Sequence, residues 1–198
     1  VYKDYLALYE KGFLGGIHLI SKKGDELEDT LIPVDGIGFG SPCIFEDKDK
    51  VYISFITQAG DLYVWNPQGE LLEGFPENLE GVFFLNVKFV NGVLIALAED
   101  GTLYKVGMDA QITQVKIPNL SAKSGYITIT DYDEDKKDEI FLCGESNAIY
   151  GLSSDLEYLN AFPITGYGIP VFQDLNGDKK IDIISLAIDN KLNAWKLY

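Results

Sequence analysis

The 198-residue sequence has little positive charge and no long hydrophobic run. It carries 16 basic and 31 acidic side chains, which gives a formal net charge of −15, and its basic residues form no cluster. Phosphate groups are bound mainly through Lys and Arg with release of counterions, so neither nucleic acid nor an anionic membrane is an expected partner. No apolar run approaches the roughly 18–20 residues that span a bilayer, and we expect no transmembrane segment in this chain.

Histidine and cysteine are scarce as well, with one and two copies respectively. With His18 as the single histidine, a Ser-His-Asp or Cys-His arrangement and a histidine-based zinc site have few ways to form. Cys43 and Cys143 each lie in an apolar, strand-like stretch, and we expect two buried, unpaired thiols. A disulfide between them is the alternative, so the cysteine content does not fix the redox compartment.

Glycine, tyrosine and phenylalanine are abundant, with 20, 12 and 11 copies, and few stretches favour a helix, which together indicate an all-β protein. A short strand pattern also recurs five times. Each copy opens with Gly or Asn, as a tight hairpin turn requires, and an apolar anchor residue follows within a few positions. The anchors are spaced 41 to 46 residues apart: Ile17, Leu62, Leu103, Ile149 and Leu192.

A second marker keeps the same phase. An apolar residue followed by proline comes 14 to 16 residues after each of the first four anchors, at Ile32-Pro33, Phe75-Pro76, Ile117-Pro118 and Phe162-Pro163. In the best-preserved copy, alternating apolar residues and short turns predict strands over 126–130, 139–143, 148–152 and 156–162. Four antiparallel strands in a repeat of this length are typical of one blade of a β-propeller.

We therefore predict an all-β β-propeller built from about five four-stranded antiparallel units, forming a single domain or propeller fragment over 1–198. The units are expected at 1–40, 41–81, 82–124, 125–167 and 168–198. A sandwich or a solenoid is the structural competitor, although a sandwich has no reason to repeat so regularly. The first unit begins at its second strand and the last unit lacks its fourth. This suggests that the chain belongs to a longer protein or makes an incomplete ring.

Two acidic loops in the fourth and fifth units carry the predicted chemistry. Both follow the pattern D-x-[DN]-x-D-x-x-x-[DE], with side-chain oxygens at positions 1, 3, 5 and 9 and a backbone carbonyl at position 7. Oxygen ligands of this kind suit a hard cation, so we predict two Ca²⁺ sites. The predicted ligands of the first site are Asp131, Asp133, Asp135, the carbonyl of Lys137, and Glu139. Those of the second site are Asp174, Asn176, Asp178, the carbonyl of Lys180, and Asp182.

The alternative is that both loops are solvated turns, which would be preferred if only one loop existed. Two copies at one phase of the repeat favour metal binding. Glu134 stands where the second loop has Gly177, a departure expected to weaken the first site. The other units do not keep the pattern: 46–51 is short and wrongly spaced, and 89–93 is expected to be a two-residue turn.

Aromatic residues recur at equivalent positions in the third strand of several units. Trp65 and Trp195 occupy equivalent positions, and Tyr63, Tyr104 and Tyr150 each follow their anchor by one residue. We expect both sets to pack between neighbouring blades rather than to form a platform for a ligand.

Together with phrases such as Leu-Tyr-Val-Trp and Gly-Phe-Pro, the two acidic loops resemble FG-GAP/VCBS repeats, the family of integrin-α-type propellers. The resemblance covers nearly the whole chain and is most specific at 131–139 and 174–182. It implies an extracellular, cell-surface or periplasmic setting, although no signal peptide is visible. It also implies adhesion, ligand binding or an accessory role beside an enzyme.

We accordingly expect a non-catalytic, calcium-binding propeller that binds a protein or carbohydrate partner, and we predict no catalytic residue. The alternative function is a propeller domain of a carbohydrate-active enzyme, either a glycosidase or a polysaccharide lyase. A pair of facing carboxylates about 5–10 Å apart would favour this alternative.

Overall fold

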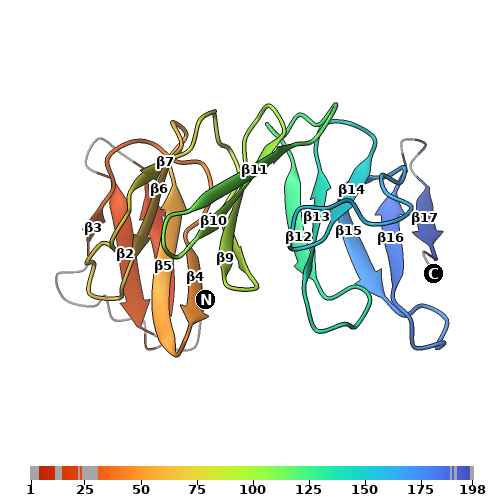
Figure 1. Cartoon of the computed structure of the whole chain (residues 1–198), viewed down its shortest axis with the longest axis horizontal. Coiled ribbons are helices and arrows are strands. Elements are labelled where there is room, and N and C mark those ends of the chain that lie inside the picture. Colours follow the sequence, from red (N-terminus) through yellow and green to blue (C-terminus); the bar gives the residue numbers. More distant parts are fainter. Residues whose placement is uncertain are drawn as a thin grey trace.

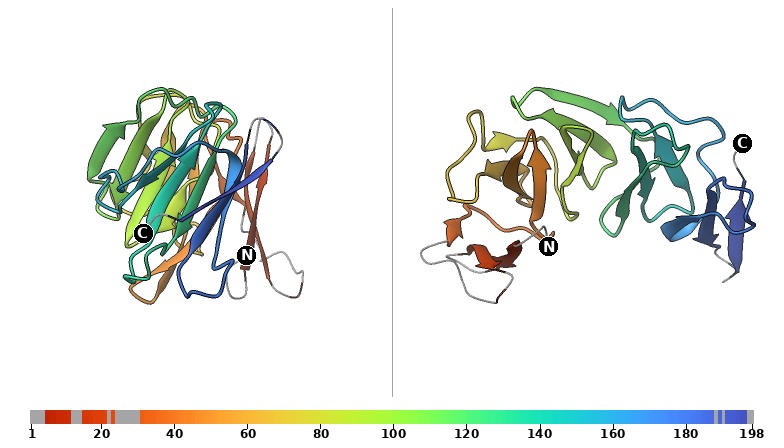
Figure 2. Two further views of the ribbon diagram at one scale, coloured as in Figure 1. Left: turned by 90° about the vertical axis from the view of Figure 1, so that its right-hand side faces the viewer. Right: turned by 90° about the horizontal axis from the view of Figure 1, so that it is seen from below.

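The computed structural model describes residues 5–11, 15–21, 23, 31–187, 189 and 191–196. In this part of the chain all regular secondary structure is β-strand, arranged in five antiparallel sheets that follow one another along the sequence. The sheets stand side by side around an open arc, which is seen from below in Figure 2. The predicted all-β fold class is confirmed. Among these residues, no helix has the length and apolar character needed to cross a bilayer.

Each sheet is made from consecutive strands, as expected for a blade (Figure 1). The first two sheets contain β1 (Tyr5–Glu10), β2 (Gly16–Ser21) and β3 (Ile32–Pro33), and then β4 (Cys43–Asp47), β5 (Lys50–Ile56), β6 (Asp61–Trp65) and β7 (Glu77–Asn78). The third contains β8 (Lys88–Val90), β9 (Val93–Leu97), β10 (Thr102–Gly107) and β11 (Ile112–Lys116). The last two contain β12 (Tyr126–Thr130), β13 (Glu139–Cys143) and β14 (Ile149–Leu152), and then β15 (Tyr167–Gln173), β16 (Asp182–Leu186) and β17 (Leu192–Trp195).

The fourth unit corrects one sequence prediction, because the strand expected over 156–162 is not formed. This segment pairs with the third strand through one isolated bridge, between Leu152 and Tyr158, and one neighbouring hydrogen bond, from Leu159 N to Gly151 O. Leu156 and Ala161 have φ values of 65° and 69°, in the left-handed region that a continuous strand does not visit. The fourth sheet therefore has three strands, and the prediction of a fourth was wrong.

The connection between the first two strands of a sheet has two forms. In the second and third sheets it is a tight hairpin turn, at Lys48-Asp49 and at Asn91-Gly92. All four of these residues have positive φ, as the turns that match the twist of antiparallel strands require. The two-residue turn predicted within 89–93 is confirmed. In the fourth and fifth sheets the same connection is lengthened into the acidic loops.

Neighbouring sheets are held together by apolar side chains packed face to face. Each fully buried aliphatic side chain contributes roughly 1.5–3 kcal/mol relative to exposure, so these interfaces supply most of the favourable packing energy. Buried residues at the successive interfaces include Ile17, Leu19, Ile53 and Phe55; Leu62, Val64, Leu94 and Ala96; Ile95, Leu97, Ile140 and Leu142; and Phe141, Ile149 and Ile183. The acidic loops are thus attached to two firmly packed sheets.

Three tyrosines add a hydrogen bond to this packing. Each lies on the third strand of its sheet and donates its hydroxyl to a backbone carbonyl in the segment that arrives from the preceding sheet. The donor–acceptor pairs are Tyr63 with Asp35 at 3.3 Å, Tyr104 with Glu80 at 2.6 Å, and Tyr150 with Pro118 at 2.9 Å. The sequence predicted only packing for these tyrosines. The structure shows that each one also links its sheet by a hydrogen bond to the segment that connects it with the preceding sheet.

Both cysteines are free thiols. Cys143 is buried as expected, whereas Cys43 is only partly buried. Burial raises the pKa of both thiols, so neither is an activated thiolate. His18 lies on β2, and its Nε2 is 2.9 Å from Oε2 of Glu10 on the paired strand. The imidazole of His18 thus lies beside a carboxylate of the neighbouring strand.

Candidate metal centre

The two acidic loops occupy the same place in adjacent sheets. Residues 131–138 join β12 to β13, and residues 174–181 join β15 to β16. Both loops project from one edge of the arc, at the bottom of Figure 1. The repeat thus places two potential cation sites on the same side of neighbouring blades.

The backbones of the two loops follow the same path. The fourth position has positive φ in both, at 62° for Glu134 and 79° for Gly177. The sixth position does too, at 73° for Lys136 and 66° for Lys179. Glu134 therefore adopts the conformation that glycine adopts in the second loop, at a steric cost that only a side chain incurs. Glutamate in place of glycine at this position therefore adds conformational strain, but the backbone keeps a positive φ as in the second loop.

Carboxylates of the first loop fold it by accepting backbone N–H groups. Positions 1, 3, 5 and 9 accept from positions 6, 5, 7 and 2 respectively. The accepting and donating atoms are Asp131 Oδ2 and Lys136 N at 3.0 Å, Asp133 Oδ1 and Asp135 N at 3.2 Å, Asp135 Oδ1 and Lys137 N at 2.8 Å, and Glu139 Oε2 and Tyr132 N at 2.7 Å. The acidic side chains are consequently turned toward the loop itself.

This folding brings together three of the predicted ligands. Carboxylate oxygens of Asp131, Asp133 and Glu139 all lie within 4.8 Å of one another. Oδ1 of Asp131 is buried and has no hydrogen-bond partner among the described residues. Asp135 is not part of this close group, and its Oδ1 accepts the N–H of Lys137. The proposed carbonyl ligand of Lys137 stays a prediction.

Glu139 is the most strongly perturbed acid of the group. Its side chain lies under the loop and the residue is only 5% exposed. Burial raises the pKa of its carboxyl to about 7, and the carboxylates of Asp133, Asp135 and Asp131 add to the increase, against the opposing effect of the Tyr132 N–H. A bound cation would remove the repulsion that produces part of this shift.

The second loop repeats the hydrogen-bond pattern of the first. Asp174, Asn176, Asp178 and Asp182 occupy positions 1, 3, 5 and 9, and their oxygens again accept from positions 6, 5, 7 and 2. The accepting and donating atoms are Asp174 Oδ2 and Lys179 N at 2.8 Å, Asn176 Oδ1 and Asp178 N at 3.0 Å, Asp178 Oδ1 and Lys180 N at 3.0 Å, and Asp182 Oδ2 and Leu175 N at 3.0 Å. The four side chains thus fold the second loop as their counterparts fold the first. Among the described residues, however, only the first loop brings three carboxylates within 4.8 Å of one another.

Charge is distributed differently in the second loop. Backbone N–H groups, foremost that of Lys179, hold the pKa of the Asp174 carboxyl below its usual value. The buried acid is Asp182, which is 2% exposed. Its Oδ2 also accepts from Nδ2 of Asn176 at 3.2 Å, while its Oδ1 is buried and has no hydrogen-bond partner among the described residues. The carbonyl of Lys180 as a ligand stays a prediction.

The residues present fit a hard divalent cation. Both loops offer oxygen donors only, and each contains a buried carboxylate oxygen without a partner, on Asp131 and on Asp182. Buried polar atoms in folded proteins are nearly always satisfied, so a carboxylate oxygen without a partner in the protein marks a place where an ion or a water can bind. Calcium accepts six to eight oxygen ligands in flexible geometry, which suits loops of this kind.

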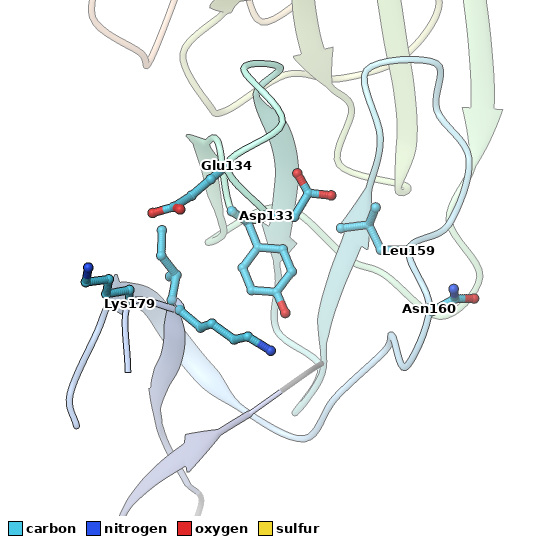
Figure 3. Close-up of a pocket in the computed structure, with 8 residues that line it drawn as sticks. Asp133, Glu134, Leu159, Asn160 and Lys179 are labelled. Atoms are coloured by element: carbon cyan, nitrogen blue, oxygen red, sulfur yellow. The ribbon is translucent and has the colours of Figure 1, made fainter. Parts of the chain in front are cut away.

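A cavity of about 340 Å³ lies between the two loops (Figure 3). It is lined by residues of both loops and of the segment that follows β14: Tyr132, Asp133, Glu134, Leu159, Asn160, Lys179, Lys180 and Ile181. Figure 3 shows Glu134 and Lys179 on one side of this cavity and Leu159 and Asn160 on the other. The sequence patterns did not reveal the cavity, because Leu159 and Asn160 belong to neither acidic motif.

No protein-family model and no curated protein matches this sequence. Solved structures do match. The structure of BamB from Moraxella catarrhalis is 13% identical, with a TM-score of 0.58 over 96% of this chain and 55% of that chain. Two structures of BBS1N in complex with ARL6DN are 12% and 11% identical, with TM-scores of 0.64 and 0.66, over 98% and 97% of this chain and 56% of those chains.

At this level of identity the likeness shows the fold alone. BamB and BBS1N are β-propellers, and this chain has the β-propeller fold. It spans about half the length of the solved structures that it matches.

Proposed function

We propose that this chain is a calcium-stabilised β-propeller module that binds a protein or carbohydrate ligand outside the cytoplasm and catalyses no reaction. One observation carries the proposal. Two loops at the same phase of the repeat share positive φ at their fourth and sixth positions and four equivalent hydrogen bonds from the backbone to side chains. Each also has a buried carboxylate oxygen without a partner among the described residues, at position 1 in the first loop (Asp131) and at position 9 in the second (Asp182). A bound cation would satisfy these oxygens and would offset the repulsion between the neighbouring carboxylates.

Each ion would be held by side chains of a single loop and would neutralise carboxylates that otherwise repel one another. In the first loop the donors would be Asp131, Asp133, Asp135, Glu139 and the carbonyl of Lys137. In the second they would be Asp174, Asn176, Asp178, Asp182 and the carbonyl of Lys180. Because such a site does not exist in the unfolded chain, binding would stabilise the two sheets that carry the loops.

Membership of the FG-GAP/VCBS family is part of the proposal. It is supported by the ligand spacing at 131–139 and 174–182 and by the strand that follows each loop at once, β13 and β16. The extracellular or periplasmic setting goes with this family and with its use of calcium.

A protein ligand is supported by one of the structural neighbours, because BBS1N was solved in complex with ARL6DN. The cavity between the acidic loops offers a place for such contact. Its walls combine apolar residues, Leu159 and Ile181, with charged groups of both signs. Pockets that combine an apolar wall with a few polar groups are the usual form of a ligand site.

Thermal unfolding in EDTA and in excess Ca²⁺ tests the proposal. At a hundredfold excess over Kd, one site adds about 2.7 kcal/mol, which corresponds to a rise in Tm of roughly 5–10 °C for a protein of this size. Asp133→Ala and Asp178→Ala should each lose part of this rise. Glu73→Ala, which removes one exposed carboxylate far from both loops in the sequence, should keep all of it. Equal Tm values with and without calcium in the unmodified protein would exclude the metal sites.

A further inference from the structure

A lysine outside the acidic motif contacts the second loop. Lys196 directly follows β17, and its Nζ lies 2.9 Å from Oδ2 of Asp178, the fifth position of the loop. The other oxygen of Asp178 accepts the N–H of Lys180 at 3.0 Å. The ammonium group therefore contacts the Asp178 oxygen that does not accept the N–H of Lys180.

A second observation, besides the acidic composition, supports a cation site in the second loop. Asp182 is 2% exposed, and its Oδ2 is fixed inside the loop by Leu175 N and Asn176 Nδ2. Its Oδ1 is buried without a partner among the described residues. Lys196 thus stands at the outer side of a loop whose inner side already presents an unpaired oxygen.

The first loop lacks this arrangement. Lys196 lies four residues after the repeat anchor Leu192, and the equivalent residue of the fourth unit, four after Ile149, is Ser153. The Ser153 hydroxyl accepts the N–H groups of Asp155 and Glu157 within its own turn. Between described residues, no salt bridge reaches the predicted acidic ligands of the first loop, Asp131, Asp133, Asp135 and Glu139.

The two loops consequently differ in charge. The predicted side-chain ligands of the first loop are four carboxylates. Those of the second are three carboxylates and one amide, with the ammonium of Lys196 added. A divalent ion entering the second loop meets fewer negative charges and must also displace, or approach closely, a positive one. Both effects weaken binding, since affinity in calcium loops depends on the number of charged ligands.

We propose that Lys196 sets the calcium affinity of the second loop, acting as a built-in competitor that makes this site weaker than the first. The proposal rests on the calcium-binding function proposed above. Lys196 also ties the end of the edge strand β17 to the connection between β15 and β16. Calcium entry releases that tie, so occupancy of the second loop is coupled to the end of the strand.

Calcium titration by isothermal calorimetry tests this assignment. The Asp133→Asn substitution is introduced first to abolish calcium binding by the first loop. The heat that is still measured then comes from binding to the second loop. In that background Lys196→Gln should tighten the calcium Kd about threefold to tenfold, because it removes the competing charge. Lys196→Arg keeps the charge and should leave Kd within about twofold of the unmodified value.

The matched control is Lys191→Gln. It removes the same charge from the same end of the chain, but Lys191 pairs with Asp189, at 2.6 Å, rather than with a predicted ligand. Equal affinities for the Lys196→Gln and Lys191→Gln variants would overturn the role of Lys196 and leave calcium binding intact. Absence of calcium binding in the unmodified chain would instead overturn the proposed function itself.

Should Asp133→Asn disturb folding of the fourth sheet, the same comparison is made in the unmodified background. The weaker of the two calcium affinities should then shift in Lys196→Gln, and the stronger should stay unchanged. A shift confined to the stronger affinity would contradict the assignment. The Tm of each variant in EDTA reports whether the fold is intact.

Discussion

The ninth position of each acidic loop holds an acidic side chain that is buried close to other carboxylates. Glu139 and Asp182 are nearly fully buried, yet both are acids that sit among other carboxylates. A carboxylate is unfavourable in an apolar core, and one oxygen of each side chain accepts a backbone N–H. When it is ionised, Glu139 destabilises the metal-free fold, and a cation beside it would offset that cost.

The raised pKa of Glu139 gives a pH dependence whose sign can be worked out. Its pKa is about 7 in the folded protein against 4.5 for the free side chain, so the folded state binds the proton more tightly between these values. In EDTA, the contribution of Glu139 should therefore stabilise the fold as pH falls from 8 to 5. In excess calcium it should oppose stability over the same range, because protons then compete with the ion.

Urea unfolding from pH 5 to pH 8 measures this contribution as the difference between the unmodified protein and Glu139→Gln. The variant cannot ionise at this position, and its amide oxygen can still accept the N–H of Tyr132. Glu139→Gln should be relatively more stable than the unmodified protein at pH 8 in EDTA, and it should lose calcium stabilisation. If the difference in the free energy of unfolding between the two proteins did not depend on pH in EDTA, the raised pKa of Glu139 would be contradicted.

Among elements, the third strands carry both packing and hydrogen bonds between blades. Leu62, Leu103 and Ile149 are fully buried, and the tyrosine after each of them reaches back to the preceding connection. Two successive residues of one strand therefore hold a blade to its neighbour in two different ways.

Removal of one such hydroxyl should have a measurable cost. Tyr150→Phe leaves the ring in place and deprives the carbonyl of Pro118 of its donor, so we expect a loss of about 1 kcal/mol in the free energy of unfolding. Tyr158→Phe is the matched control, because Tyr158 is 45% exposed. Urea unfolding compares the two variants, and an equal effect of both substitutions would show that the hydroxyl bond contributes nothing.

Element boundaries were predictable where the local pattern was strong. The strands at 126–130 and 139–143 were expected from alternation and are found at those residues as β12 and β13. The strand expected over 156–162 fails because Leu156 and Ala161 turn left-handed, and neither residue type signals that conformation. The cavity beside the loops could not be predicted, since tertiary packing alone brings Leu159 next to the fifth sheet.

At the scale of the whole molecule, five sheets form an open arc whose last blade has an apolar outer face. Leu186 and Leu192 on this face are 37% and 74% exposed. The equivalent residues of the fourth sheet, Cys143 and Ile149, are buried against the fifth sheet. The number and order of the units could be predicted from the repeat in the sequence. Each copy of the repeat forms one sheet, and each sheet buries its faces against the neighbouring sheets.

The two acidic loops lie next to each other on this arc, so calcium would act on adjacent blades at once. A formal charge of −15 leaves the chain self-repelling, and four positive charges from two ions would offset part of it at the place where acids are densest. The central claim is accordingly that both loops, and not one alone, are cation sites.

Anomalous X-ray diffraction from crystals grown in millimolar Ca²⁺ tests this claim most directly. One calcium peak is expected in each loop, the first between Asp131, Asp133 and Glu139 and the second beside Asp178 and Asp182. The absence of anomalous density from either loop at that concentration, in crystals where both loops are ordered, would contradict the account.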